Sequence, residues 1–268
     1  MTITPAWLDL DGAVNVRDLA GLPTADGRAV APHRLVRADN LQGLSDADVR
    51  RLVDDVGVRT VVDLRTGVEV QAEGPGPLTR EPAVDVRHLS LFPEAGGTTD
   101  VASAEDGTVV LPWQERELPA SDDERRRGAS GVYLAYLDDR PDSVIAALRA
   151  IAGSPGATVV HCAAGKDRTG VVVAFALAEV GVERDEIVAD YERTAERIGA
   201  ILARLRASTT YAGDLAGQVD EDRHRPRAET MRRLLDAVTE QYGGVPAWLR
   251  THGWTDADGA ALRAKLLA

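Results

Sequence analysis

The residues best suited to chemistry stand together in HCAAGKDRTG, residues 161–170. A short apolar run (residues 157–160) precedes them and a longer one (169–180) follows, so we expect a turn between a strand and a helix. In such a turn, successive backbone N–H groups face one concavity of phosphate size, and the helix adds its positive end. The same field favours the thiolate form of Cys162, and Arg168 can fold back onto two phosphate oxygens. A thiolate beside a bound phosphate is a nucleophile for phosphoryl transfer.

The spacing of Cys162 and Arg168 is by itself weak evidence for a phosphate site, because arginine is common in this chain. Of the 31 basic residues, all except Lys166 and Lys265 are arginines. A lone buried cysteine after a strand is also ordinarily inert packing. Because the whole string 161–170 stands at a strand–helix junction, a nucleophilic cysteine is favoured here over an inert one. Lys166 reads either as a solvated side chain or as a second cation in the cradle, which suits substrates with more than one phosphate.

The composition excludes several classes of function. The net charge of −12 over 268 residues opposes binding to nucleic acid and to anionic membranes. No apolar run reaches the roughly 20 residues of a membrane span, so stable membrane insertion is not expected. A single cysteine excludes an intramolecular disulfide and a multi-thiolate metal site, and we expect no metal and no cofactor. Residues 1–11 lack a signal core, so we expect a cytoplasmic protein, with export by another route left open.

The first third of the chain alternates helical and strand patterns. Ser45 reads as an N-cap for a helix whose apolar stripe ends at Gly57. Strands follow over 58–64 and 84–91. Helices that alternate with strands at this spacing predict an α/β fold with a central, mostly parallel sheet flanked by helices.

The remainder divides into a polar excursion and a helical part. Residues 93–131 lack periodicity, so we expect a long loop that is either disordered or functional as a lid. Apolar periodicity then predicts helices, first on either side of Pro141 and then throughout the C-terminal portion, residues 183–268. The predicted helical ranges are 132–137, 143–151, 183–206, 227–242, 247–252 and 256–267. We expect one domain over residues 1–268.

The string at 161–170 resembles the signature His-Cys-x5-Arg-Ser/Thr of cysteine-dependent tyrosine and dual-specificity phosphatases. More narrowly, it resembles the HCxxGKDRTG loop of a family of bacterial protein tyrosine phosphatases. Shorter segments agree with that family: GAVNVRD at 12–18, LVR at 35–37, VDLR at 62–65, IVADY at 187–191 and YGG at 242–244. The resemblance covers nearly the whole chain outside residues 93–131, and it implies the cysteine-dependent phosphatase fold.

The resemblance also implies a role for each loop residue. Cys162 would attack phosphorus to form a phosphocysteine, and Arg168 would bind the phosphoryl oxygens. Backbone N–H groups of Ala163, Ala164, Gly165 and Lys166, continuing to Arg168, would hold the same oxygens. Thr169 would hydrogen-bond the thiolate, and His161 would orient the loop from behind it.

The general acid has two candidates. A leaving tyrosine oxygen needs a proton, and Asp167 is our first choice, although it could instead form a structural ion pair with a neighbouring arginine. Glu94, in Phe-Pro-Glu, is the alternative, since the family has Phe-Pro-Asp in a similar place; its longer side chain is a departure from that pattern. We expect a further set to form structural networks: Asn15, Arg17, Asp18, Asp63 and Arg65.

Three functions are therefore compared. The first is a phosphatase acting on phosphotyrosine proteins, with phosphoserine and phosphothreonine as further substrates. The second uses the same loop on a phosphoinositide or another small phosphate monoester. The third is a catalytically silent phosphate-binding module, which the presence of both Cys162 and Arg168 disfavours. By the same resemblance, part of the C-terminal helices would cover the site as a lid; the apolar stripe from Ile198 to Leu205 fits packing equally well.

Overall fold

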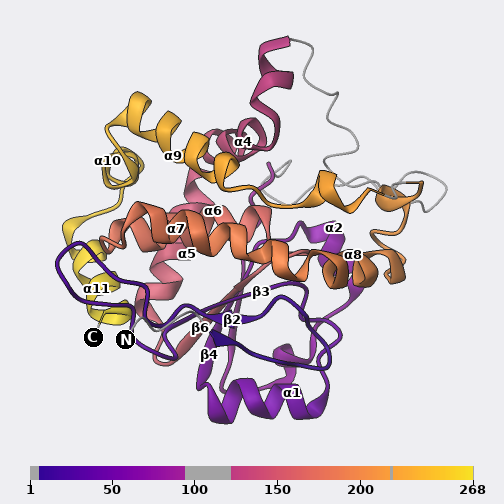
Figure 1. The fold of residues 1–268 in the computed structure, drawn as a ribbon. Helices are drawn as coiled ribbons and strands as arrows, with labels where there is room; N and C mark the ends of the chain where they lie inside the picture. The colour runs from indigo at the N-terminus through magenta and orange to yellow at the C-terminus, as the bar shows by residue number, and fades with distance from the viewer. Residues whose placement is uncertain (1–5, 94–121, 218–219, 268) are drawn as a thin grey trace.

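A six-stranded sheet forms the centre of the protein (Figure 1). The computed structural model describes residues 6–93, 122–217 and 220–267, with the backbone alone for 122–129. The strand order is β1-β2-β3-β6-β4-β5, in which β3, β6, β4 and β5 are parallel and β1 and β2 are antiparallel additions. The strands are β1 Ala6–Trp7, β2 Arg17–Asp18, β3 Leu35–Ala38, β4 Val58–Asp63, β5 Asp85–His88 and β6 Ala157–His161. This confirms the predicted mostly parallel α/β sheet.

Helices cover both faces of the sheet, and each face has its own apolar core (Figure 1). On one face lie α1 Asp46–Arg50 and the π-helical turn η1 Arg51–Asp55; on the other, α5 Pro141–Gly153 and α6 Asp167–Glu179 pack on the central strands. Every residue of β6 is buried, which explains its unbroken β-branched run. The sheet therefore holds the end of β6 rigidly between two packed layers.

Two predicted boundaries are confirmed, the first of them by capping geometry. Ser45 caps α1, and its hydroxyl and the Asp48 carboxylate form a reciprocal capping box. Pro141 is the first residue of α5, and Arg140 alone separates it from the end of α4 Asp122–Asp139. Helix α4 begins ten residues before the predicted residue 132. The prediction missed these residues because the charged first half of the helix has no apolar periodicity, whereas Tyr133 and Leu137 in the second half are buried. The aperiodic excursion predicted over 93–131 is thus helical from Asp122; residues 94–121 lie outside the described residues.

The helical C-terminal portion is confirmed, but one expected helix is divided. The pattern over 183–206 becomes α7 Arg184–Arg193, the 3-10 turn η4 Thr194–Arg197 and α8 Ile198–Ala207. At the division Thr194 is buried, and its hydroxyl accepts a hydrogen bond from Arg17. The other elements are α2 Gly67–Glu73, η2 Pro77–Arg80, η5 Gly213–Leu215, η6 Glu221–His224, α9 Ala228–Tyr242, α10 Val245–Thr251 and α11 Asp256–Leu266. Among the described helices, none is long and apolar enough to span a bilayer.

Candidate active site

The predicted turn between a strand and a helix is present at residues 162–166. Cys162 follows β6 directly, Asp167 is the first residue of α6, and β6 lies between β3 and β4 in the sheet. The Cys162 thiol is free and the residue is only 2% exposed. We call residues 162–168 the phosphate loop. Its position places a buried thiol at the carboxyl end of a central strand and at the amino end of a buried helix.

Gly165 gives the phosphate loop its tight path. Its φ of +64° lies in the left-handed region, and a Cβ there would be 2.4 Å from the backbone oxygen of Ala38. Any other residue would therefore be strained and would also displace β3. This glycine lets the loop curl closely against the sheet.

Arg168 is buried and is held by a carboxylate that the sequence did not point to. Its Nη1 lies 2.5 Å from Glu69 Oε2 and its Nη2 lies 2.8 Å from Glu69 Oε1. Glu69 is itself fully buried in α2; burial alone would raise the pKa of its carboxyl, but Arg168 holds that pKa below its usual range. The guanidinium also lies over the ring of Phe92, 5.6 Å from its centroid. Arg168 is thus fixed in orientation beside the loop.

Asp167 is placed at the rim of the loop, with a side chain 33% exposed. The Tyr133 hydroxyl donates a hydrogen bond to its Oδ1, and that hydroxyl is 2.7 Å from the Tyr191 hydroxyl. Asp167 Oδ2 is 3.5 Å from the Lys166 ammonium. Each carboxylate oxygen therefore has a neighbour, Tyr133 at Oδ1 and Lys166 at Oδ2, while a third of the side chain remains exposed.

Two further predicted site residues are Lys166 and Glu94. Lys166 donates to the backbone oxygen of His224 at 3.0 Å, and its side chain is 17% exposed. Glu94, the alternative acid, lies outside the described residues. Phe92, two residues before it, is buried against Arg168 and Tyr136. The chain therefore passes close to the site just before Glu94.

His161 is the last residue of β6, directly before Cys162. Its Nε2 is 3.6 Å from Asp63 Oδ1, and the Asp63 carboxylate pairs with Arg65 at 2.6 Å. Burial lowers the pKa of His161 to about 4, against the opposing effect of Asp63. The ring is therefore neutral at pH 7. Asp63 and Arg65 form a buried structural pair, in line with their predicted role.

The other predicted network residues also lie in buried contacts. Asn15 and Arg17 approach the loop, and Arg17 pairs with Asp190 at 2.8 Å. Asp18 lies elsewhere: its carboxylate accepts hydrogen bonds from the backbone of Ala20 and His33. Asp18 is thus a turn-stabilising residue away from the phosphate loop.

Comparison with known proteins agrees with this geometry. The sequence model of a family described as "Tyrosine phosphatase family" matches residues 8–268. This chain belongs to that family. It is 31% identical to the triple specificity protein phosphatase PtpB of Mycobacterium tuberculosis, over 97% of this chain and 98% of that protein. It is 28% identical to a tyrosine-protein phosphatase of Nostoc commune, over 96% and 81% of the two chains. The family assignment confirms the predicted class of enzyme.

Sequence reasoning on this phosphatase missed three residues that meet the site. They are Glu69, Tyr133 and Tyr211. Tyr211 packs with Ala163 in one apolar cluster, and its hydroxyl donates to Glu69 Oε1 at 3.0 Å. The Thr66–Glu69 spacing of a capping box was a signal for the start of α2, but it could not indicate that Glu69 reaches Arg168. No local sequence pattern indicated that Tyr133 or Tyr211 would lie at the site.

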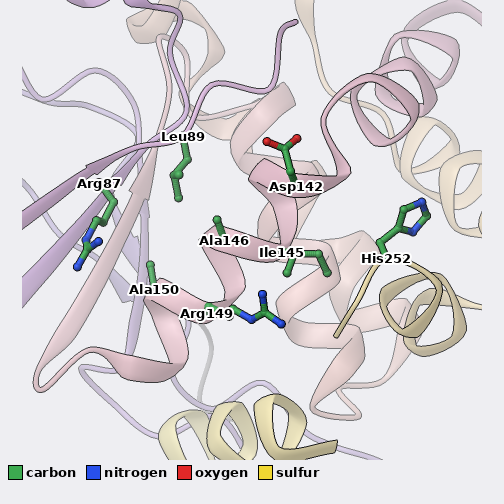
Figure 2. A pocket seen from close by; sticks show the side chains of 8 residues that line it. All are labelled: Arg87, Leu89, Asp142, Ile145, Ala146, Arg149, Ala150 and His252. Carbon is green, nitrogen blue, oxygen red and sulfur yellow. The ribbon is translucent and has the colours of Figure 1, made fainter. Parts of the chain in front are cut away.

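A separate pocket lies between β5, α5 and the end of α10 (Figure 2). Its floor is apolar, with Leu89 and Ile145, and its charged rim residues already have partners; Arg149, for example, binds Asp258 with two hydrogen bonds. No predicted site residue lines it. The candidate active site of this phosphatase is therefore the phosphate loop and not this pocket.

Proposed function

We propose that this chain is a cysteine-dependent protein tyrosine phosphatase that hydrolyses phosphotyrosine, with phosphoserine and phosphothreonine as further substrates. The observation that carries the proposal is the placement of the buried Cys162 thiol and the fixed Arg168 guanidinium on one phosphate loop. An arginine held in one orientation binds two oxygens of a phosphoryl group as a fork. The thiolate below that group then has a phosphorus atom in reach.

In the first step the Cys162 thiolate attacks phosphorus, and the bond between phosphorus and the tyrosine oxygen breaks. The leaving oxygen takes a proton from the Asp167 carboxylic acid, whose side chain is 33% exposed at the rim of the loop. Backbone N–H groups from Ala163 to Arg168 hold the phosphoryl oxygens as charge develops on them. The products of this step are free tyrosine hydroxyl and phosphocysteine.

In the second step water attacks phosphorus, the sulfur–phosphorus bond breaks, and inorganic phosphate leaves. The Thr169 hydroxyl supports this step, because it is buried and has no hydrogen-bond partner among the described residues. It can donate to the departing thiolate and stabilise the charge that forms there. Asp167, now ionised, accepts the proton of the attacking water.

A direct test is to trap the intermediate. Wild-type protein is mixed with a phosphotyrosine peptide in EDTA, quenched in acid within milliseconds and digested, and the Cys162 peptide is examined by mass spectrometry. We expect a phosphate adduct on Cys162 that disappears as substrate is consumed. Phosphate release without any adduct on this peptide would contradict the mechanism. Release of phosphate that depends on Cys162 would exclude a catalytically silent phosphate-binding module.

A second substrate class is favoured by Lys166, a second cation on the phosphate loop beside Arg168. Its ammonium donates to the backbone oxygen of His224 at 3.0 Å and lies 3.5 Å from the Asp167 carboxylate. Two cations on one loop suit a phosphoinositide or another substrate with a second phosphate. One relative is named a triple specificity phosphatase. Comparison of kcat/KM on a phosphotyrosine peptide and on short-chain phosphoinositides, in wild type and in Lys166→Met, tests this: the variant should lose more activity on the phosphoinositide.

We also propose that part of the helical C-terminal portion, residues 183–268, covers the phosphate loop as a lid within a single domain. Two contacts support this: Tyr211 packs on Ala163, and the backbone oxygen of His224 accepts a hydrogen bond from Lys166. Substrate entry would require both contacts to open. Tyr211→Ala should then raise the rate constant for association of a phosphotyrosine peptide, measured by stopped-flow; an unchanged rate constant would contradict the lid.

A further inference from the structure

The outer side of the phosphate loop is held by two buried side chains. Asn15 Nδ2 donates to the backbone oxygen of Ala164 at 2.9 Å and to that of Gly165 at 3.3 Å. Arg37 Nη2 donates to the Gly165 oxygen at 2.8 Å. Both side chains come from β2–β3 and the turn before them, far from the loop in sequence. Two consecutive carbonyl groups of the loop are thus bound by side chains that come from the β2–β3 part of the sheet.

A carbonyl held in this way also orients the next amide. In a trans peptide the C=O and the following N–H point in opposite directions. Holding the Ala164 and Gly165 oxygens therefore turns the N–H groups of Gly165 and Lys166 away from Asn15 and Arg37. Gly165 is left-handed and Lys166 right-handed (φ −105°, ψ −70°), an alternation that makes successive N–H groups converge on one anion.

The N–H groups of the loop are available as donors. Within the described part of the chain, no residue accepts a hydrogen bond from the backbone N–H of Ala163, Ala164, Gly165 or Lys166. Buried amides nearly always have a partner, so a run of amides like this one is suited to a bound anion. The carbonyls, in contrast, are fully engaged behind the loop.

The two holding side chains are themselves fixed by one carboxylate. Asp190 of α7 accepts from Arg37 Nη1 at 2.6 Å and from Arg17 Nε at 2.8 Å. Arg17 Nη1 in turn donates to Asn15 Oδ1 at 2.9 Å, which leaves the Nδ2 of Asn15 facing the loop carbonyls. Two guanidinium groups face one carboxylate, so an excess positive charge lies behind the loop. Burial lowers the pKa of Arg17 to about 10, and it remains cationic at neutral pH.

We infer that Asn15 and Arg37 are positioning residues that aim the amides of Gly165 and Lys166 at the phosphoryl group, with Asp190 and Arg17 fixing both. Neither residue touches substrate; each acts through a peptide plane of the phosphate loop. The inference rests on the proposed function, because it assigns the aimed amides to a phosphoryl group. It explains why Asp190 of α7 is buried against two guanidinium groups although it does not touch the loop.

The test compares Asn15→Leu, which keeps the side-chain volume but removes both polar atoms, with a matched control, Thr60→Val. Thr60 is also buried, and its hydroxyl donates to Ser154 at 2.9 Å, away from the loop. Asn15→Ser is made in parallel in case the leucine variant does not fold. All are assayed well below their melting temperatures for the affinity of inorganic phosphate, for kcat and KM on para-nitrophenyl phosphate, and for the amide NMR shifts of Gly165 and Lys166 on adding phosphate.

We expect both Asn15 variants to bind phosphate at least about tenfold more weakly and to lose kcat by about ten- to a hundredfold, less than deletion of an oxyanion donor itself. Their Gly165 amide shift on adding phosphate should shrink, whereas Thr60→Val should match wild type in all three readouts. Wild-type phosphate affinity and shifts in both Asn15 variants, with hydrolysis intact, would overturn this inference alone. A wild-type protein that neither binds phosphate nor hydrolyses the substrate would overturn the proposed function and this inference together.

Discussion

Glu69 and Arg168 meet through both oxygens of the carboxylate and both terminal nitrogens of the guanidinium, at 2.5 and 2.8 Å, with both side chains buried. This geometry fixes the plane of the guanidinium before any substrate arrives. Ordering a free arginine side chain would otherwise cost conformational entropy at the moment of binding. The pair neutralises the buried charge of Arg168, and in the proposed mechanism it prepares the phosphate loop for the phosphoryl group.

The first prediction concerns this pair. Glu69→Gln leaves the Arg168 charge buried with a weaker partner, so we expect the free energy of unfolding to fall by about 3 kcal/mol. Because the guanidinium is no longer held in one plane, kcat/KM should fall by about tenfold or more. Urea unfolding and steady-state kinetics measure the two effects. Glu73→Gln, on the same helix but only partly buried, is the control, and identical behaviour of the two variants would contradict the role given to Glu69.

The second prediction identifies the general acid. On an alkyl phosphate, whose leaving group is poor, loss of the acid should lower kcat by about 10²- to 10⁴-fold and remove the basic limb of the pH–rate profile. We expect this of Asp167→Asn, because the Asp167 side chain stands partly exposed at the rim of the loop. Glu94→Gln is measured beside it. If Glu94→Gln alone loses the basic limb, the assignment passes to Glu94.

The third prediction concerns the anchoring of that acid. Tyr133→Phe removes the hydroxyl that donates to Asp167 and leaves its ring packing in place. A carboxyl group without this anchor spends less time directed at the leaving oxygen, so kcat should fall about two- to tenfold for a poor leaving group. For para-nitrophenyl phosphate, which needs little help from an acid, kcat should be nearly unchanged. Equal losses on both substrates would show that Tyr133 acts through general structure.

The fourth prediction concerns pH and His161. Burial lowers the pKa of this histidine to about 4, whereas an unfolded histidine titrates near 6.5. Between these values the unfolded chain binds a proton that the folded chain does not, so the contribution of His161 is complete above pH 6.5 and is lost as the pH falls toward 4. NMR of the imidazole should show a neutral ring at pH 5. A protonated ring at that pH would contradict the prediction.

The titration of Asp39 changes the free energy of unfolding in the opposite direction over part of the same pH range. Burial raises its pKa to about 6 from 3.8, so the folded chain takes up a proton before the unfolded chain does. Protonation of Asp39 therefore favours folding as the pH falls below 6. Between pH 7 and 5, His161→Gln should lose less stability than wild type and Asp39→Asn should lose more. Urea unfolding at the two pH values separates these contributions.

The phosphate loop was predictable because its signals are local. The β-branched run before Cys162, the glycine at 165 and the apolar helix after Arg168 each follow from the preferences of neighbouring residues. The α/β sheet was predictable for the same reason, since each strand and each cap has its own short pattern. Where the pattern is weak, as in the charged first half of α4, the boundary was missed.

The residues around the loop could not be predicted, since they depend on the order of strands in the sheet. Glu69 lies 99 positions before Arg168, and Asn15 lies 149 positions before Ala164. Insertion of β6 between β3 and β4 brings the carboxyl ends of these strands, together with the segments after them, around the loop. No periodicity in the sequence encodes that insertion. Sequence reasoning could name Asn15 and Arg17 as network residues but could not say which groups they hold.

The nucleophilic role of Cys162 is the central claim, and the phosphate released by Cys162→Ser from a phosphotyrosine peptide tests it most directly. The serine hydroxyl is a far weaker nucleophile than a thiolate, so the rate should fall by at least about a thousandfold. Inorganic phosphate should still bind this variant, because Arg168 and the loop amides remain. Hydrolysis by Cys162→Ser at the wild-type rate would contradict the account.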